Sequence, residues 1–457
     1  MDLLPKEIFL EIFKYLSSSD LIALTEVCST FNQLISSTER LLDKIPVYLQ
    51  YSQSRIDLAR SQYSEISNLI INGIRFGRRK YTKIFIGEID KEILIKISEI
   101  LGENVHEVVF KRGNHELETV AKILLNFKNV RKLKFCRRSV RSEILQLKSE
   151  IPILNIDELL LENIGSQVFR VLAASKVKKL ECTIGRRICQ HEFIPEEVGQ
   201  FLTLQNDLKE LKLERIAWNI NDMLENENIN QMKFKLTSLS LNDVIIDDSN
   251  IFTNFMRPHF DSLKKLELVR IEEFNFSQVL RQMTALKELK VISTWLDIFR
   301  PFDNVVKLEI EYPHVLKFFP NLKELKISCA IFGPYQIHLW NEYIAHPQLT
   351  SIEIGNLSML NFPHLPTLRK LKLKNIERIY VEVFYQNPQI EELVIEKREG
   401  RIMRYDYEID FISSRLPNLK LLEIVGGKVC RRYLDLAKER CKKLKYLRLI
   451  DVDVVAS

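Results

Sequence analysis

The chain has 457 residues, of which 46% are hydrophobic and 28% charged, a composition typical of a soluble folded protein. Its 67 basic and 61 acidic residues give a formal net charge of +6, a weaker bias than nucleic-acid binders usually show. No run of eighteen uncharged apolar residues predicts a membrane span, and Lys6, Glu7 and Glu11 interrupt the first apolar run. We therefore expect neither a membrane segment nor a signal peptide.

The cysteines indicate a reduced compartment. Seven are present, which is an odd number, and none forms a CxxC pair. Because a secreted disulfide framework usually needs an even number of cysteines, we expect an intracellular protein of the cytoplasm, the nucleus or both.

Residues 4–35 predict three short helices. Pro5 suits the first turn of a helix, where its missing N–H costs nothing, and Ser17–Ser19 breaks that helix. Asp20 is a candidate cap for the second helix, and Ser29 for the third. Apolar residues follow at helical spacing in all three segments: Ile8, Phe9, Ile12, Phe13 and Leu16, then Leu21, Leu24, Val27 and Cys28, then Phe31, Leu34 and Ile35.

These apolar faces are too extensive for so short a stretch to bury alone, since about thirty-five residues form only a small core. One interpretation is a helical cap on a larger core, and the other is a surface that docks on a partner. A cap would need one apolar face, whereas the sequence supplies a wide face and then two more. We therefore favour partner docking.

The order of residues in this stretch resembles an F-box. It reads Leu-Pro-x-Glu-Ile from Leu4, Ile-Phe-x-Tyr-Leu from Ile12, Asp-Leu from Asp20 and Val-Cys-x-x-Phe-Asn from Val27. The resemblance covers about the first forty residues, and we place the F-box at residues 1–42 with a helical spacer at 43–65. It implies binding to a Skp-type adaptor, which links F-box proteins to a cullin-based ubiquitin ligase.

The resemblance also implies which residues contact the adaptor. They are Leu4, Pro5, Ile8, Ile12, Phe13, Leu16, Leu21, Val27, Cys28 and Phe31. Two positions depart from the family pattern, because Phe31 replaces the usual Trp and Ser29-Thr30 replaces a common basic pair. Both departures leave the hydrophobic anchor in place.

A six-residue pattern, apolar-x-x-apolar-x-apolar, recurs at intervals of about 24 residues through the rest of the sequence. Its copies run from Tyr81/Ile84/Ile86 to Leu444/Leu447/Leu449, and Ile66/Leu69/Ile71 resembles an earlier copy. The alternating apolar residues of each copy point one way from a short strand, so neighbouring copies must stack to cover them. We predict a solenoid of about 16 repeats over residues 66–457.

The predicted fold belongs to the α/β class, with a three-helix F-box followed by a leucine-rich-repeat solenoid. We expect a curved parallel β-sheet on the concave side and helices and turns on the convex side, as in the leucine-rich-repeat class of F-box proteins, which the chain resembles. Many such repeats carry Asn or Cys three residues after the last strand apolar. Here aliphatic residues such as Ile164, Val244 and Ile271 stand there, which predicts irregular curvature.

Lys and Glu alternate from copy to copy between the apolar positions, as in Lys83, Glu107, Lys132 and Glu158. Because parallel strands lie about 4.8 Å apart, this alternation predicts a checkerboard of paired charges that fixes strand register and opposes edge association. A surface that carries both signs of charge also argues against a nucleic-acid groove.

The alternation lapses at both ends of the repeats, where apolar side chains take the place of charged ones. At the start these are Phe85 and Val109. At the end they are candidate substrate-binding residues, namely Val394, Leu421, Val425, Tyr446 and Ile450. The alternative is that the insertion at residues 397–410 or the chain end at 452–457 folds over them.

No Walker, GxSxG, HExxH or GxGxxG motif occurs, so we expect neither an enzyme nor a cofactor site. Cys182, Cys189 and His191 come nearest to a metal-ligand cluster, but Cys182 occupies a strand-core position, which favours a structural role. The resemblance implies a substrate-recognition subunit of an SCF-type (Skp-adaptor, cullin, F-box) E3 ubiquitin ligase, which binds a target protein through its repeats. The alternative is an adaptor-binding scaffold outside a cullin ligase; on neither interpretation do we expect nucleic acid or membrane as a partner.

Overall fold

The computed structural model describes residues 5–17, 20–21, 23–24, 29–38, 41, 47–49, 81–137, 139–140, 152–184, 194–215, 219–224, 229–271, 276–294, 301–311, 313–328, 346–355, 359–360, 364–375, 378–379, 382–396 and 405–455. The chain divides into two compact units, Met1–Pro258 and His259–Ser457.

The first unit contains a helical cluster with a core of its own. Helix α1 spans Lys6–Phe13 and helix α3 spans Ser29–Ser37, with further helical residues at 20–21 and 23–24. Between them, the Ser17 backbone N–H donates to Asp20 Oδ2 at 3.3 Å, and the Ser17 hydroxyl accepts from the Asp20 N–H at 3.2 Å. This reciprocal pair is a capping box, so the predicted cap at Asp20 is wrong by three residues: Ser17 caps the second helix.

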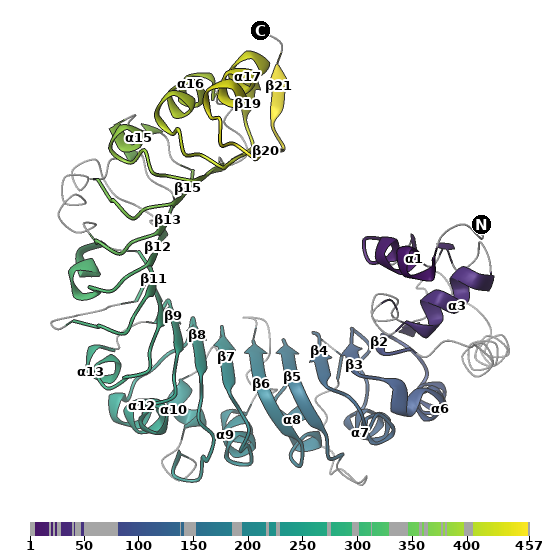
Figure 1. Ribbon diagram of the computed structural model, residues 1–457. Helices are drawn as coiled ribbons and strands as arrows, with labels where there is room; N and C mark the ends of the chain where they lie inside the picture. The colour runs from purple at the N-terminus through teal and green to yellow at the C-terminus, as the bar shows by residue number, and fades with distance from the viewer. Residues whose placement is uncertain are drawn as a thin grey trace. The chain divides into compact units, whose positions relative to one another are not determined.

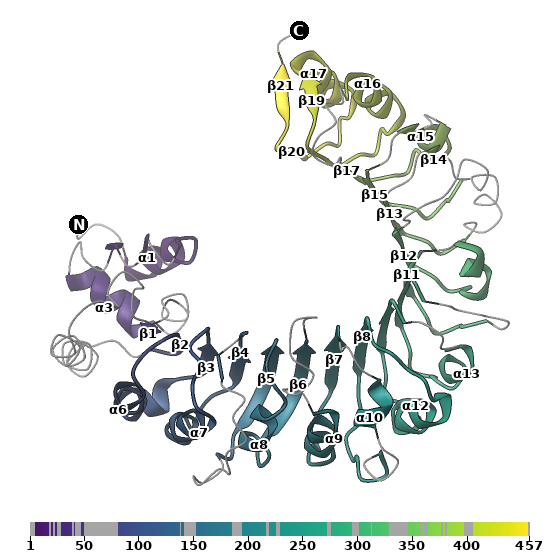
Figure 2. The ribbon, with the colours of Figure 1, turned by 180° about the vertical axis from the view of Figure 1, so that it is seen from behind.

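The repeats of the first unit build a parallel sheet in chain order, β1 to β8. Its helices lie along one side of the sheet, as the two opposite views show (Figures 1 and 2). The strands are β1 Val47–Leu49, β2 Lys83–Ile86, β3 Glu107–Phe110, β4 Lys132–Phe135, β5 Asn155–Glu162, β6 Lys176–Thr183, β7 Glu210–Glu214 and β8 Ser238–Asn242. The helices are α6 Lys91–Leu101, α7 Leu117–Asn126, α8 Val168–Val171, α9 Pro195–Thr203, α10 Ile220–Met223 and α12 Ser249–Met256, with 3-10 turns at Gly102–Asn104 and Arg257–His259.

Strand β1 corrects the predicted helical spacer. Tyr48 pairs with Phe85 of β2 in a parallel ladder, so residues 47–49 extend the sheet instead of forming a helix. The apolar and aromatic residues Val47, Tyr48 and Leu49 suit a strand that buries one face. Residues 50–65 of the predicted spacer, and the candidate early copy Ile66/Leu69/Ile71, lie outside the described residues.

The second unit repeats the arrangement in a parallel sheet from β9 to β20. Its strands are β9 Lys265–Val269, β10 Glu288–Ile292, β11 Lys307–Ile310, β12 Glu324–Ser328, β13 Ser351–Gly355, β15 Lys370–Lys374, β17 Glu392–Glu396, β18 Leu421–Val425 and β20 Tyr446–Ile450. Its helices are α13 Ser277–Leu280, α15 Glu382–Gln386, α16 Asp406–Arg415 and α17 Arg431–Arg440, with a 3-10 helix at Pro313–Phe318. Two short parallel pairs accompany them: β14 Met359–Leu360 with β16 Arg378–Ile379, and β19 Lys428–Cys430 with β21 Asp453–Val455.

The apolar positions of the six-residue pattern are buried together with apolar residues of the helices, such as Leu94 and Phe201. In the copy at β7, for example, Leu208, Leu211 and Leu213 are all buried. The same holds for most copies, which confirms that stacked repeats cover one another. In the copy at β20, however, Leu444, Leu447 and Leu449 are only half-buried.

The turn after most described strands passes through a residue with positive φ, two positions beyond the last strand apolar. These residues are Asn163, Arg215, Asp243, Arg270, Ser293, Asn375 and Asp451, with φ between 48° and 61°. The N–H of Asn163 donates to the Thr183 carbonyl at 2.7 Å, and that of Asn375 to the Glu396 carbonyl at 2.7 Å. The left-handed residue thus ties each turn to the next repeat, and the aliphatic residue that follows it packs inward, as buried Ile164 does.

An asparagine ladder is present, but it precedes the strands. The Asn129 amide donates to the Glu103 carbonyl at 2.7 Å, and the Asn321 amide donates to the Asp303 carbonyl at 2.9 Å. Asn304 makes the same contact with Thr284 at 2.7 Å. Each asparagine side-chain amide therefore satisfies a backbone carbonyl of the preceding repeat. The aliphatic side chains in the turns after the strands have no donor and cannot make such a bond.

His115 is buried where the turn after β3 meets residues 139–140. Its N–H donates to the Ser139 carbonyl at 2.9 Å, and its ring packs edge-on against Phe110 at a centroid distance of 6.0 Å. Burial lowers the pKa of the His115 imidazole below its ordinary value, with a backbone hydrogen bond at Gly87 acting in the opposite direction. The folded state therefore holds His115 neutral under conditions in which the unfolded chain would protonate it.

This burial predicts acid sensitivity. Because the unfolded state binds the extra proton, the free energy of unfolding should fall as pH drops below about 6.5 and level off below the folded pKa. One such group contributes at most about 1.4 kcal/mol per pH unit. Urea unfolding of the intact chain and of a His115→Phe variant between pH 7.5 and 5 measures this. An unchanged pH slope in the variant would rule out His115 as the source.

Candidate protein-binding surfaces

Helix α1 buries one face against α3. Phe13 and Phe31 meet edge to face with centroids 5.4 Å apart, and Phe9 lies 5.2 Å from Phe31. The buried members of this cluster are Phe13, Leu21, Phe31, Leu34, Ile35 and Leu41, and Phe9, Leu10, Leu16 and Leu24 pack against it. All of these residues lie between positions 9 and 41, so the cluster fills its core from its own sequence.

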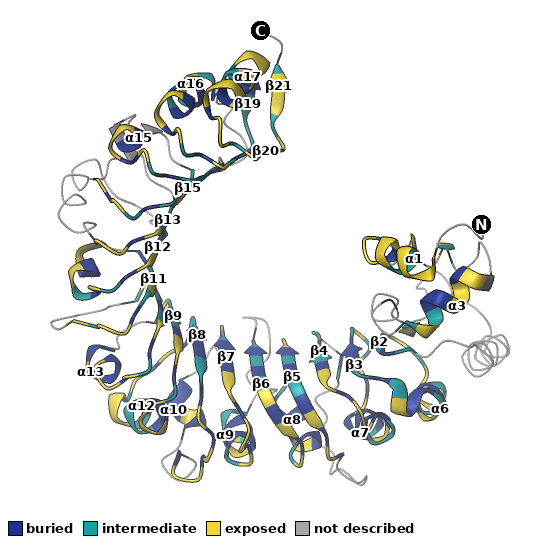
Figure 3. Cartoon of the chain, in the orientation of Figure 1, coloured by how far each residue is buried: buried dark blue, intermediate teal, exposed yellow. Residues whose placement is uncertain are grey.

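The opposite face of α1 carries an apolar stripe that none of the described residues covers. Ile8 and Ile12 are four residues apart and lie on one side of the helix. Pro5 precedes the helix and Tyr15 lies in the turn that follows it, and both are exposed. Ile8 is 42% exposed, Ile12 47% and Tyr15 87%. Most of α1 is exposed, as Figure 3 shows, and Phe13 is its one buried residue. We call these four residues the α1 stripe.

Side chains between the apolar strand positions project from the sheet on the side away from the helices, here called the inner face. The strand register places opposite charges side by side, with Lys83 beside Glu107 and Lys179 beside Glu158. The corresponding ion pairs measure 2.5 and 2.6 Å. In the second unit, Lys326 lies 3.0 Å from Glu309, and Lys370 lies 2.9 Å from Glu392.

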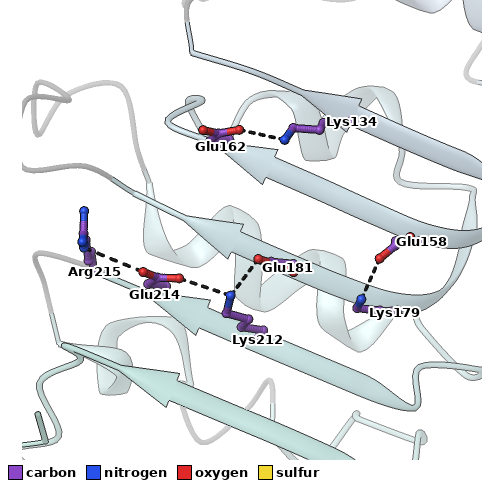
Figure 4. A network of polar contacts seen from close by, with 8 residues as sticks. All are labelled: Lys134, Glu158, Glu162, Lys179, Glu181, Lys212, Glu214 and Arg215. Atoms are coloured by element: carbon purple, nitrogen blue, oxygen red, sulfur yellow. Dashed lines mark hydrogen bonds and ion pairs between the residues drawn. The ribbon is translucent and has the colours of Figure 1, made fainter. Parts of the chain in front are cut away.

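The pairs also join into networks (Figure 4). Lys212 lies 2.8 Å from Glu181 of the neighbouring strand and 3.2 Å from Glu214 of its own strand. The hydrogen bond from Lys179 to Glu158 raises the pKa of the lysine ammonium. Because these side chains are partly solvated, each pair contributes about 0–1 kcal/mol. The predicted checkerboard is therefore confirmed, and its effect is to favour the observed register over slipped ones.

An aromatic stack occupies the inner face at the start of the repeats. Tyr48 lies parallel to Phe85 with centroids 4.7 Å apart, and the Lys111 ammonium lies 4.4 Å from the Phe85 centroid and 4.9 Å from that of Tyr48. Val109, the neighbour of Phe85 across the ladder, is buried. At the predicted apolar positions, Val109 is thus buried and Phe85 is half-buried, while Tyr48, which stacks on Phe85, is 60% exposed.

The inner face at the end of the second unit carries apolar residues on both sides of the Glu423–Arg448 ion pair. Leu421 pairs with Tyr446 and Val425 pairs with Ile450 across the β18–β20 ladder. Tyr446 is 57% exposed and Ile450 is also exposed, whereas Val394, Leu421 and Val425 are half-buried. Of the segments that could cover them, residues 397–404 and 456–457 lie outside the described residues, and Asp453–Val455 pairs with β19.

The sequence of the helical cluster matches a known family. The sequence model of the F-box-like family covers residues 1–45. Residues 1–45 form an F-box-like domain. The stacked parallel strands that follow form a leucine-rich-repeat solenoid, with a repeat length of about 24 residues inside the range of that class. None of the curated proteins compared gives a significant match.

Several solved structures match the chain at low sequence identity. The mouse RP105/MD-1 complex matches with 12% identity and a TM-score of 0.45, covering 82% of this chain and 68% of that chain. The yeast complex of Rad7 and Elc1 matches with 12% identity and a TM-score of 0.34, covering 91% and 94%. A leucine-rich-repeat protein of Leptospira interrogans matches with 16% identity and a TM-score of 0.32, covering 85% and 93%. TM-scores below 0.5 carry no information about function.

Within the F-box-like domain, the predicted adaptor contacts fall into three groups. Pro5, Ile8 and Ile12 are exposed on the α1 stripe. Phe13, Leu21 and Phe31 are buried in the domain core and Leu16 is half-buried against it, so these four support the surface from beneath. Leu4, Val27 and Cys28 lie outside the described residues. Sequence reasoning missed Tyr15, although its spacing from Ile12 was a usable signal.

The candidate metal ligands do not come together in the described chain. Cys182 is buried in β6 at a strand-core position, and burial raises the pKa of its thiol. Cys189 and His191 lie outside the described residues. Among the residues that the structure describes, no three His, Cys, Asp or Glu side chains gather at a metal-binding spacing, and no helix is long and apolar enough to cross a membrane.

Proposed function

We propose that the chain is a substrate-recognition subunit of an SCF-type E3 ubiquitin ligase. The observation that carries this proposal is the α1 stripe: an F-box-like domain whose core is already filled still presents Ile8, Ile12 and Tyr15 to solvent. An exposed apolar ridge of this kind is suited to a hydrophobic groove on a partner, in which i, i+4 and i+7 residues of a helix serve as anchors. The partner proposed is a Skp-type adaptor, and through it a cullin.

The proposed role is non-catalytic. The F-box-like domain would hold the adaptor, and the repeats, which we propose to span residues 66–457, would hold a target protein. Ubiquitin transfer would then gain from proximity, because a bound target reacts at a raised effective concentration. The place of action proposed is the cytoplasm, the nucleus or both.

The second candidate function is a scaffold that binds the adaptor but engages no cullin. A leucine-rich-repeat solenoid could bind a partner protein in either role. Co-purification of the tagged intact chain from its own cells separates the two. Recovery of adaptor and cullin together supports the ligase subunit, whereas recovery of adaptor alone supports the scaffold. Recovery of neither would contradict both.

The target-binding surface that we propose is the apolar end of the inner face, at Val394, Leu421, Val425, Tyr446 and Ile450. A Leu421→Ser/Tyr446→Ser variant should weaken target capture about tenfold or more, since buried apolar anchors contribute roughly 1–2 kcal/mol each to an interface. Proximity labelling with the intact chain, this variant and the adaptor-deficient Ile8→Glu/Ile12→Glu variant measures the effect. Targets should be labelled by the first and third proteins but not by the second; unchanged labelling by the serine variant would remove this surface from consideration.

A further inference from the structure

The charge of the chain is concentrated at the end of its second unit. Between Arg431 and Arg448 the sequence carries eight basic and two acidic residues, a net charge of +6 that equals that of the whole chain. Four of the eight lie on α17, at Arg431, Arg432, Lys438 and Arg440. The other four, Lys442, Lys443, Lys445 and Arg448, lead into or lie on β20. We call these eight residues the basic end.

The basic end is exposed and only partly neutralised. All eight side chains are exposed. Arg440 lies 2.7 Å from Asp410, and Arg448 lies 3.4 Å from Glu423. Among the residues that the structure describes, no carboxylate lies within 4.0 Å of the other six, and Lys443 donates to the Asn418 amide oxygen at 2.7 Å. Acidic groups that remain nearby are Asp435, Glu439, Asp451 and Asp453, of which Asp453 lies 3.6 Å from Lys428.

Among the described residues, no strand pairs with the outer edge of β20. Its partner on the other edge is β18. The Tyr446 N–H donates to the Lys420 carbonyl and the Ile450 carbonyl accepts from the Gly426 N–H, so the backbone groups of Tyr446 and Ile450 point toward β18. Because backbone groups alternate in direction along a parallel strand, those of Leu447 and Leu449 face the other way, toward the outer edge. Their side chains are only half-buried, unlike the equivalent leucines of the inner repeats.

We propose that this end of the solenoid binds an acidic, extended segment of a target protein, which adds to the edge of β20 as a further strand. The backbone groups of Leu447 and Leu449 would pair with the segment, while its apolar side chains cover these two leucines. Its acidic side chains would meet Lys442, Lys443, Lys445 and Arg448. Open strand edges select a polypeptide over a nucleic acid, since only a polypeptide can continue the ladder.

The proposal deepens the proposed function, on which it rests, by naming the chemistry of the target. The probe is a fluorescein-labelled decapeptide in which Glu and Val alternate, so that one face is acidic and the other apolar in a strand. The full chain should bind it measurably, and binding should weaken as salt rises. Lys442→Glu/Lys443→Glu/Lys445→Glu should reduce affinity at least tenfold. The matched control, Lys96→Glu/Lys128→Glu/Lys209→Glu, reverses three exposed lysines of the first unit and should bind as the intact chain does.

Strand pairing is tested with two further peptides of unchanged charge, methylated on the backbone nitrogen of every Glu or of every Val. Since alternate N–H groups of a strand point to opposite sides, methylation of one set should abolish binding and methylation of the other should change it by less than about threefold. Equal binding of both peptides, or loss of both, would overturn the pairing. Tighter binding of a twelve-nucleotide single-stranded DNA would overturn the choice of polypeptide. Adaptor binding is measured on the same samples, so failure here is distinct from failure of the proposed function.

An alternative use of the basic end is to keep copies of the chain apart, since lysine on an edge strand opposes edge association. In that case the intact chain should not bind the acidic decapeptide at all, and Lys442→Ser/Lys443→Ser/Lys445→Ser should self-associate in size-exclusion chromatography with light scattering. That pair of results would overturn the binding proposal.

Discussion

Ile8→Glu/Ile12→Glu is expected to weaken adaptor binding at least a hundredfold while leaving the protein folded. Both side chains are more than 40% exposed in the free domain, so carboxylates there cost little stability. In the complex they would be buried without a partner, and two lost anchors amount to about 3 kcal/mol or more. Calorimetric titration of purified chain with its Skp-type adaptor measures the effect.

The chain offers a matched control for that variant. Tyr385 in helix α15 and Tyr407 in helix α16 of the second unit are large exposed side chains on helices, as Ile8 and Ile12 are. Tyr385→Glu/Tyr407→Glu adds the same charge and should bind adaptor normally. Normal adaptor binding by the Ile8/Ile12 variant would show that the α1 stripe is not the docking surface.

Phe13→Ala should have the opposite profile, abolishing adaptor binding by unfolding the helical domain. The ring is buried against Phe31, and removing a buried phenylalanine costs about 3–5 kcal/mol. A core of so few residues cannot absorb that loss, whereas the repeats have separate cores. Hydrogen exchange followed by mass spectrometry should show lost protection at residues 5–17 and 29–38 and unchanged protection in β5 to β8. Ile12→Ala serves as the control, because truncating an exposed residue should leave protection intact; intact protection in Phe13→Ala would contradict the assignment of Phe13 to the core.

The repeats were predictable because the sequence of each copy determines the register of its own strand. A strand position is defined by apolar residues two apart, and the alternation of Lys and Glu fixes which strands are neighbours, as with Lys179 and Glu158. Repeats that contact only their neighbours need no long-range information. The positions of most strands therefore follow from spacing alone.

Features that depend on tertiary contact were not predictable. Strand β1 has three residues, too few to show a period, and it is specified by pairing with β2. The Tyr48–Phe85 stack joins residues 37 positions apart in sequence. Arg215 and Arg270 take left-handed turns that their residue type does not favour, because the next repeat accepts their N–H groups.

The candidate site was predicted in outline but not in detail. Helical spacing identified the apolar residues of the F-box-like domain, yet it could not divide them between core and surface. That division required α3, since Phe31 packs against Phe9 and buried Phe13 and leaves Ile8 and Ile12 exposed. The basic end was not predicted, because the net charge of the whole chain is small and does not show that basic residues are concentrated at positions 431–448.

The most direct test of the central claim is reconstitution of a ternary assembly from purified proteins. The intact chain, its Skp-type adaptor and the cullin that this adaptor binds are mixed and analysed by size-exclusion chromatography with light scattering. The proposed function predicts a single species with the mass of one copy of each, which Ile8→Glu/Ile12→Glu fails to form and Tyr385→Glu/Tyr407→Glu forms normally. Elution of the intact chain apart from an adaptor–cullin pair that has itself assembled would contradict the claim.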